Sequence, residues 1–263
     1  MAGRFFMRFN LHSSVGHFPV SADIFERLLP YEKSELTSEL ADFERIQSRR
    51  VARLRQEYPG EIELIRGKKV LFLGDSITSD NLGYRVSMSR AAELEAYDES
   101  ISGGTSPMLL HTAKRMIEKV RPDLVSLMLG ANDSVGIGCE ELCQVSIEEY
   151  GRNMERMVVW AKQSGAAVLL FAVTPVWEQR FRQGFEQEEK YQSNANIERY
   201  NALLREIAEE RGIRLIEHPW LLEDADRESF FESDGIHLSV IGQEKLAESW
   251  LIAAAKEITS QNQ

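Results

Sequence analysis

From about Gly67 onward, the sequence alternates between short apolar runs and longer amphipathic segments. The apolar runs are residues 70–73, 124–129, 167–173 and 213–216, with a less regular one inside 92–101. The amphipathic segments are 108–120, 147–163, 188–210 and 240–258. Strands of a parallel sheet are buried on both faces, so they are apolar along their length, and helices connect them. The alternation therefore predicts an α/β fold with a parallel sheet between two helical layers.

Residues 1–66 differ in character from the rest. The first twenty show no clear period, 21–29 fit a short helix that Ser21 caps and Pro30 ends, and 31–58 fit a long amphipathic helix. The apolar stripe of the long helix must be buried on the rest of the chain, against a second subunit, or over the functional site as a lid. We favour packing or a homo-oligomer through this helix. The chain is divided accordingly into an N-terminal extension, 1–66, and a main domain, 67–263.

Composition restricts the partners. The net charge of −11 over 263 residues argues against nucleic acid and anionic membranes, because both are bound through clustered Lys and Arg. Arg4 and Arg8 interrupt the first apolar residues, so no secretory leader is expected, and no later run reaches the roughly 20 apolar residues that span a bilayer. We expect a cytoplasmic protein without membrane insertion. Cys139 and Cys143 are then free thiols, and no further ligands nearby suggest a metal site.

A serine marks the end of the first apolar run, in the segment Gly74-Asp75-Ser76. Open α/β sheets bind ligands at the carboxyl ends of their strands. The Ser76 hydroxyl would face that crevice and the positive end of a helix, which favours a developing anion. The alternative is that Ser76 only caps a helix. A base and oxyanion donors at later strand ends would decide between the two.

Two later strand ends supply candidate donors. The pair Gly103-Gly104 lets the backbone approach a ligand closely and turn an N–H toward it, although such a pair also marks ordinary turns. Asn132 follows the third apolar run, and a neutral amide suits an oxyanion because it has no proton to lose. Asp133 is expected to brace the loop or cap the next segment.

A candidate base stands near the C-terminus, in Asp234-Gly235-Ile236-His237. Side chains three positions apart can meet within one turn, and a carboxylate on one imidazole nitrogen leaves the other nitrogen to take a proton from a serine. The alternative is a helix-capping aspartate beside a solvated histidine. No such acid accompanies the other four histidines, which we interpret as structural: His12, His17, His111 and His218.

In order and spacing, these segments resemble the four signature blocks of the SGNH hydrolases, the GDSL-type esterases and lipases. The resemblance covers about Gly67 to the C-terminus. It implies a flavodoxin-like three-layer α/β/α sandwich with a five-stranded parallel sheet, to which this chain adds an N-terminal helical extension. It also implies a Ser76–His237–Asp234 triad, an oxyanion hole formed by the Ser76 and Gly103 N–H groups and the Asn132 amide, and no metal or organic cofactor. Gly104 stays open as the alternative to Gly103.

The resemblance thus implies hydrolysis of a small-molecule ester through an acyl-enzyme. We expect a short acyl group on a polar alcohol such as a carbohydrate, with Asp75, Thr174 and Trp177 as substrate-binding residues. The segment 174–181 should overhang the crevice, where Trp177 and Phe181 either contact the substrate or only pack the loop. One alternative is an inactive carbohydrate- or ligand-binding protein of the same fold. A nucleotide- or phosphate-binding protein is less well supported, because the chain lacks a Walker-type lysine and a dinucleotide-binding loop.

Overall fold

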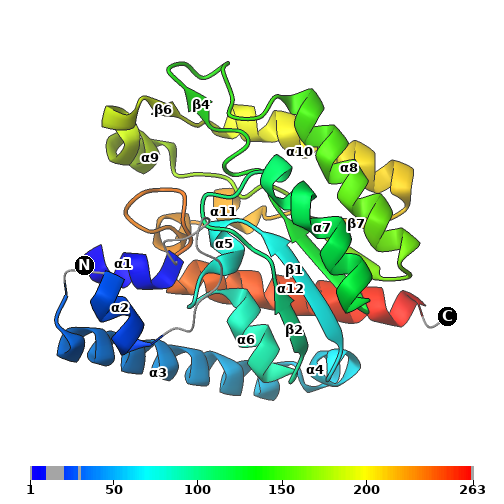
Figure 1. Cartoon of the computed structure of the whole chain (residues 1–263), viewed down its shortest axis with the longest axis horizontal. Coiled ribbons are helices and arrows are strands. Elements are labelled where there is room, and N and C mark those ends of the chain that lie inside the picture. The colour runs from blue at the N-terminus through cyan, green and yellow to red at the C-terminus, as the bar shows by residue number, and fades with distance from the viewer. Residues whose placement is uncertain (1, 10–20, 29–30, 262–263) are drawn as a thin grey trace.

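A five-stranded sheet forms the centre of the molecule, with all strands parallel in the order β2-β1-β3-β5-β7 (Figure 1). The structure is a computed structural model that describes residues 2–9, 21–28 and 31–261. The strands are β1 (Lys69–Gly74), β2 (Glu95–Asp98), β3 (Leu124–Met128), β5 (Ala167–Phe171) and β7 (Arg214–Ile216). Because β2 and β3 lie on opposite sides of β1, the direction in which successive strands are added to the sheet reverses at β1. The carboxyl ends of β1 and β3 therefore border the crevice where such sheets bind ligands.

Alternate residues of each strand enter two separate cores. In β1, Leu71 and Leu73 face the core beneath α7, α8 and α10, whereas Val70 and Phe72 face the core beneath α4, α6 and α12. The helices of these two layers are α4 (Pro59–Ile65), α6 (Tyr84–Ala91), α7 (Ser106–Val120), α8 (Ile147–Gln163), α10 (Asn194–Arg211) and α12 (Val240–Gln261). The predicted α/β/α sandwich is confirmed.

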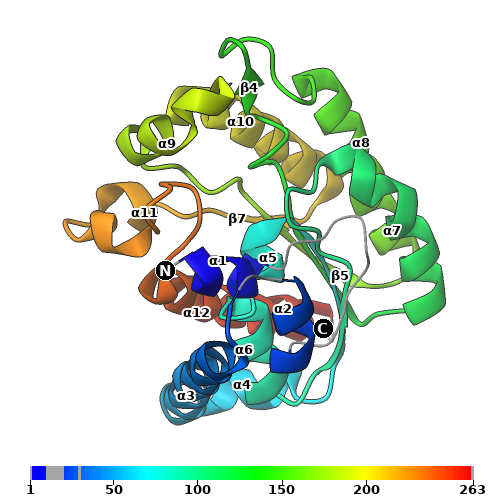
Figure 2. The same cartoon turned by 60° about the vertical axis from the view of Figure 1, so that its left-hand side comes forward.

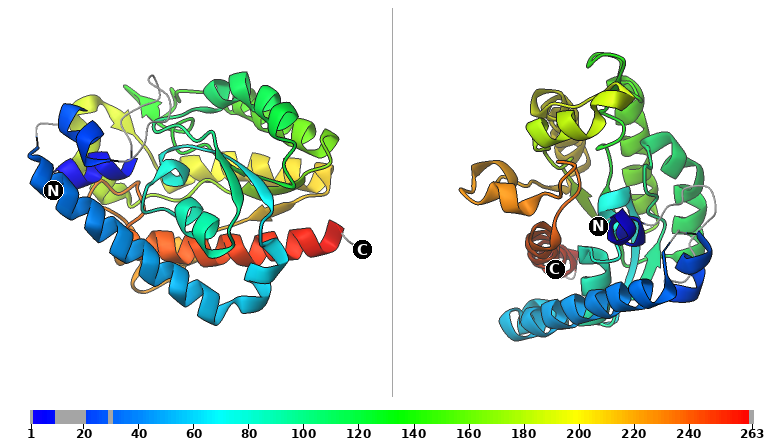
Figure 3. Two further views of the ribbon diagram at one scale, coloured as in Figure 1. Left: turned by 60° about the horizontal axis from the view of Figure 1, so that its bottom comes forward. Right: turned by 90° about the vertical axis from the view of Figure 1, so that its left-hand side faces the viewer.

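Three helices precede the sandwich: α1 (Ala2–Phe9), α2 (Ala22–Leu28) and α3 (Lys33–Glu57). The long α3 lies along the outside of the layer that contains α6 and α12 (Figure 3). Leu36 and Phe43 of α3 pack with Met7 and Leu82, and Leu54 joins the second core. The apolar stripe is thus buried within this chain. An oligomer through α3 and a domain boundary at residue 66 stay predictions.

The shorter elements depart most from the predicted pattern. β2 covers only part of 92–101, and α4 begins at Pro59, where the long helix was expected simply to end. The helix predicted from 188 starts at 194, because Lys190–Tyr191 (β6) pairs with Gly136–Ile137 (β4) and Ser193 caps α10. The remaining short elements are α5 (Ser76–Ser79), α9 (Glu178–Phe185), α11 (Trp220–Glu223), η1 (Glu186–Glu188) and η2 (Arg227–Phe230).

Ser21 caps α2 by accepting the Ile24 N–H at 3.3 Å, as predicted, whereas Pro30, His12 and His17 lie outside the described residues. Cys139 and Cys143 are free thiols. No helix in the described part of the chain has both the length and the apolar character required to cross a membrane.

Candidate active site

Ser76 lies where β1 ends and the short helix α5 begins. Asp75 caps this helix, and its carboxylate accepts the Ile77 N–H at 3.0 Å. The backbone N–H of Ser76 donates to no group in the described part of the chain. The residue is only 7% exposed. The strand end therefore holds a hydroxyl and an unused N–H donor side by side at the rim of the sheet.

His237 meets this hydroxyl from a position 161 residues further along the chain. Its Nε2 lies 2.8 Å from Ser76 Oγ, and its Nδ1 lies 2.6 Å from Oδ2 of Asp234. A carboxylate that accepts the Nδ1 proton leaves Nε2 as the acceptor for a hydroxyl. Burial raises the pKa of Asp234, but the hydrogen bond and charge of His237 outweigh burial and bring that pKa below its usual value. Asp234 therefore stays ionised at neutral pH.

The loop that carries Asp234 and His237 is held at several points. The Asp234 Oδ1 atom accepts the backbone N–H groups of Ile236 and His237 at 3.1 and 3.0 Å. Gly235 has a φ of +74°, and a Cβ there would lie 2.6 Å from the Trp177 carbonyl oxygen. The Trp177 N–H donates to the Gly235 carbonyl oxygen at 2.7 Å. The segment after β5 thus supports this loop.

Two further candidate donors lie on the segments that follow β2 and β3, the strands on either side of β1. Gly103 has a φ of +74°, which suits glycine, and its N–H donates to no group in the described residues. The Gly104 N–H is already used, because it donates to the Ile101 carbonyl oxygen at 2.8 Å. The Asn132 amide donates one hydrogen to the Gly104 carbonyl oxygen at 3.0 Å, and its second hydrogen is left for another acceptor.

Two carboxyl groups adjacent in sequence to Ser76 and Asn132 are buried, those of Asp75 and Asp133. Burial raises the pKa of Asp75 to about 7 and that of Asp133 to about 6. Asp133 accepts the Ser106 N–H at the start of α7 at 2.9 Å, so it braces its loop against a helix that precedes it in the chain, while Ser146 caps the helix that follows. Both side chains lie in the interior. That Asp75 binds substrate stays a prediction.

Thr174 and Trp177, the other two residues expected to bind substrate, are packed against the rest of the chain. The Thr174 hydroxyl is buried without a hydrogen-bond partner in the described part of the chain. The guanidinium carbons of Arg180 and Arg227 each lie 5.6 Å from the centroid of the Trp177 ring, which packs at the edge of the second core. These contacts favour loop packing for Trp177. Substrate contacts of Thr174 and Trp177 stay predictions.

Contacts from α1 to this site were not predicted from the sequence. The ring centroid of Phe9 lies 4.0 Å from that of His237, and the buried Arg8 forms ion pairs with Asp80 and Glu232. Figure 2 shows α1 beside α5. Because the first twenty residues have no periodicity and no counterpart in the SGNH motifs, no sequence pattern pointed to these contacts.

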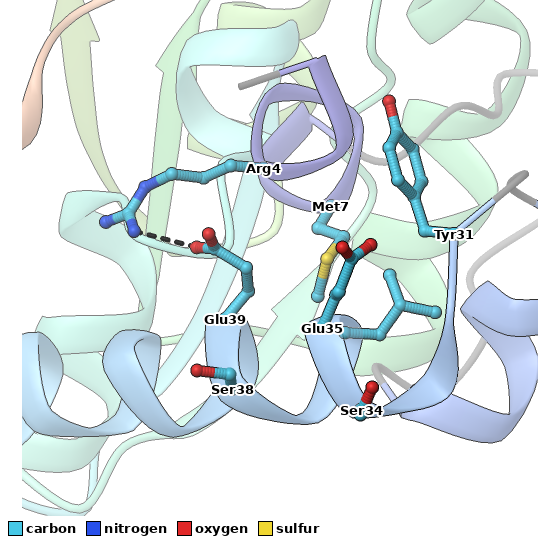
Figure 4. Close-up of a pocket in the computed structure, with 8 residues that line it drawn as sticks. Arg4, Met7, Tyr31, Ser34, Glu35, Ser38 and Glu39 are labelled. Carbon is cyan, nitrogen blue, oxygen red and sulfur yellow. Dashed lines mark hydrogen bonds and ion pairs between the residues drawn. The ribbon is translucent and has the colours of Figure 1, made fainter.

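A cavity of about 540 Å³ lies apart from the serine, between α1 and α3 (Figure 4). Arg4 and Met7 of α1 face Glu35 and Glu39 of α3 across it. Neither Ser76 nor His237 lines this cavity, so it does not enclose the hydrogen-bonded cluster. Within the described ranges, no three His, Cys, Asp or Glu side chains are grouped so that they could hold a metal ion.

A serine hydroxyl bonded to an imidazole that is itself held by a carboxylate is suited to ester hydrolysis. Together with the three-layer fold, this indicates a carboxylic ester hydrolase. A family model described as "GDSL-like Lipase/Acylhydrolase family" matches residues 72–245. The chain belongs to this family.

Individual relatives agree with this assignment. A human protein described as "Isoamyl acetate-hydrolyzing esterase 1 homolog" is 25% identical over 197 residues, which cover 68% of this chain and 77% of that protein. The lipase/acylhydrolase from Enterococcus faecalis has a TM-score of 0.58 at 19% identity, covering 72% of this chain and 96% of its own. An acetyl xylan esterase has a TM-score of 0.56 at 20% identity, covering 70% and 98%. At these identities, the two solved structures establish the fold.

Proposed function

We propose that this chain is a serine esterase in which Ser76 is the nucleophile, His237 the general base and Asp234 the residue that orients it. The observation that carries the proposal is the continuous row of hydrogen bonds from Asp234 through His237 to Ser76, with distances of 2.6 and 2.8 Å. These distances are within the range required for proton transfer between a nucleophile and its base.

The reaction has two stages. His237 Nε2 takes the hydroxyl proton as Ser76 Oγ bonds to the ester carbonyl carbon, and the carbonyl oxygen becomes an oxyanion. The imidazolium then gives its proton to the leaving alcohol as the C–O bond breaks, which leaves an acyl group on Ser76. Water attacks this acyl group with His237 again accepting a proton, and the acid is released. Asp234 stays ionised throughout and stabilises the imidazolium.

The proposed oxyanion hole consists of the Ser76 N–H, the Gly103 N–H and the Asn132 amide. All three have a hydrogen left to donate, whereas the Gly104 N–H is occupied by Ile101, which supports Gly103 over Gly104. Donors fixed before the reaction need no reorganisation when the charge develops, so they lower the barrier effectively.

We propose a short acyl group, such as acetyl, on a polar or carbohydrate alcohol as the substrate class. Within the described residues, the serine is only 7% exposed and Phe9 lies against one face of the imidazole, so the reacting atoms are closely packed, which favours a small acyl group. The human relative is named for the hydrolysis of isoamyl acetate, and one structural neighbour is named an acetyl xylan esterase. Both printed names refer to acetyl esters.

Three measurements test the proposal. Wild type should hydrolyse p-nitrophenyl acetate, and Ser76→Ala should lose at least ~10⁴-fold in kcat. In a series of p-nitrophenyl esters, kcat/KM should fall as the acyl chain lengthens, and peak activity on long chains would contradict the short-acyl assignment. A fluorophosphonate probe should label wild type at Ser76. The alternative, an inactive binding protein on the same fold, requires no labelling and no difference between wild type and Ser76→Ala.

A further inference from the structure

We propose that α1 completes the active site, with Arg8 as a positioning residue that fixes the serine and histidine loops relative to each other and with Phe9 as the cover of the His237 ring. The inference rests on the proposed function of Ser76 and His237. It assigns a role in catalysis to a segment that lies outside residues 72–245, the part matched by the family model.

Arg8 is bonded to both loops at once. Its Nη2 lies 2.6 Å and its Nε 3.2 Å from the two carboxylate oxygens of Asp80, the residue that follows α5. Its Nη1 pairs with Glu232, and its Nη2 also donates to the Leu238 carbonyl oxygen at 2.8 Å. Glu232 and Leu238 bracket Asp234 and His237. One guanidinium therefore connects the end of the nucleophile helix with both ends of the histidine loop.

The charges in this contact are withdrawn from solvent. The Arg8 side chain is 4% exposed, Asp80 is fully buried and Glu232 is 30% exposed. Burial lowers the pKa of Arg8, but the two carboxylates outweigh burial, so its pKa lies above the ordinary value and the guanidinium stays charged. A planar guanidinium with two-point contact to a carboxylate fixes orientation as well as distance, which a lysine cannot do.

Hydrogen bonds to backbone carbonyl oxygens hold the same junction. The Asn81 N–H donates to the Arg8 carbonyl oxygen at 2.9 Å, and the Asn81 amide donates to the Met7 carbonyl oxygen at 2.7 Å. From α3, Gln47 donates to the Asn81 carbonyl oxygen at 3.1 Å and Arg50 to the Leu82 carbonyl oxygen at 2.6 Å. The loop directly after the serine helix is thus enclosed by the N-terminal helices.

Phe9 contacts the reacting imidazole itself. Its ring is 4% exposed, its centroid lies 4.0 Å from that of His237, and the planes are inclined by 35°. The ring keeps water from that face of the imidazole and limits the angles that the imidazole can adopt. Since small displacements of a general base cost large factors in rate, both effects act on kcat.

The experiment compares full-length variants in p-nitrophenyl acetate hydrolysis, with kcat and KM determined separately and folding followed by thermal unfolding. Arg8→Met and Glu232→Gln should each lower kcat by ~10- to 100-fold with KM nearly unchanged, because geometry and not binding is lost. Glu232→Gln removes one charge from a partly exposed position, so it stays informative if Arg8→Met does not fold. Phe9→Ala should lower kcat in the same range, and Phe9→Leu should restore much of it.

Arg4→Met is the matched control. Arg4 lies one turn before Arg8 on the same helix but pairs with Glu39 of α3 at 2.8 Å, away from both loops (Figure 4). Partly exposed pairs contribute little, so its kcat should stay within about 2-fold of wild type. The inference is overturned if folded Glu232→Gln and Phe9→Ala keep wild-type kcat while Ser76→Ala is inactive. It is also overturned if Arg4→Met loses as much as they do. Wild-type activity in Ser76→Ala would instead overturn the proposed function.

Discussion

The backbone N–H of Trp177 donates to the carbonyl oxygen of Gly235 at 2.7 Å. This bond joins the segment after β5 to the loop between Asp234 and His237. The segment expected to overhang the crevice thus supports the histidine loop, and Trp177 contributes through its main chain whatever its ring does.

Gly235→Ala should therefore damage both stability and rate. The positive φ alone costs about 1–3 kcal/mol for alanine. The new Cβ would also lie 2.6 Å from the Phe181 nitrogen and the Trp177 carbonyl oxygen, so the loop must shift. The expected result is a lower free energy of unfolding together with a clear fall in kcat. Gly165→Ala is the matched control: Gly165 has a φ of +86° but open space around a Cβ, so stability should fall with kcat unaffected.

Asn132→Ala should lower kcat by ~10²- to 10³-fold, the usual effect of removing one oxyanion donor. KM should change little, because the amide interacts with charge that exists only in the transition state. Steady-state kinetics with p-nitrophenyl acetate measure both constants. A rise in KM at constant kcat would show that Asn132 binds the ground state and the transition state equally, which contradicts an oxyanion role.

Stability should fall as the pH rises from about 4 to about 7. Below about pH 4, Asp75 is protonated in both the unfolded and the folded state. Between about pH 4 and about pH 7, the unfolded state releases this proton. The folded state retains it, because burial raises the pKa of Asp75 to about 7. Each pKa unit of difference is worth roughly 1.4 kcal/mol. Above pH 7 both states are ionised and the fall from this residue ends.

Asp75→Asn should make this pH dependence shallower, because an amide does not ionise but can still accept the Ile77 N–H. Urea unfolding at about pH 5 and about pH 8 measures the difference. Asp133, with a pKa raised to about 6, should leave part of the slope in the variant. Identical slopes in the two proteins would show that Asp75 is ionised inside the fold.

Trp177→Leu should act on stability more than on substrate choice. The ring packs at the edge of the second core and contacts the guanidinium groups of Arg180 and Arg227, and the cation–π contacts are lost with leucine. We expect a lower thermal unfolding temperature and an unchanged order of preference among acyl chain lengths. A changed order would instead restore the substrate-binding role expected from the sequence.

The sequence determined the local parts of this protein. Apolar runs such as 70–73 must be buried on both faces, so the parallel sheet and its helical layers could be predicted without coordinates. Ser76 and Asn132 could be placed together because strand ends of a parallel sheet share one edge, so residues distant in the chain converge there. Asp234 and His237, on the loop before α12, were recognisable from their spacing and from the resemblance to the SGNH motifs.

Tertiary structure alone decided what surrounds that edge. The occupied N–H of Gly104, the backbone bond from Trp177 and the placement of Arg8 and Phe9 depend on how separate segments pack. Such contacts leave no periodic signal, because a single buried arginine or aromatic ring in an aperiodic stretch fits many environments equally well. Hydrophobic patterning specifies which face of an element is covered, and only the folded chain specifies which residue covers it.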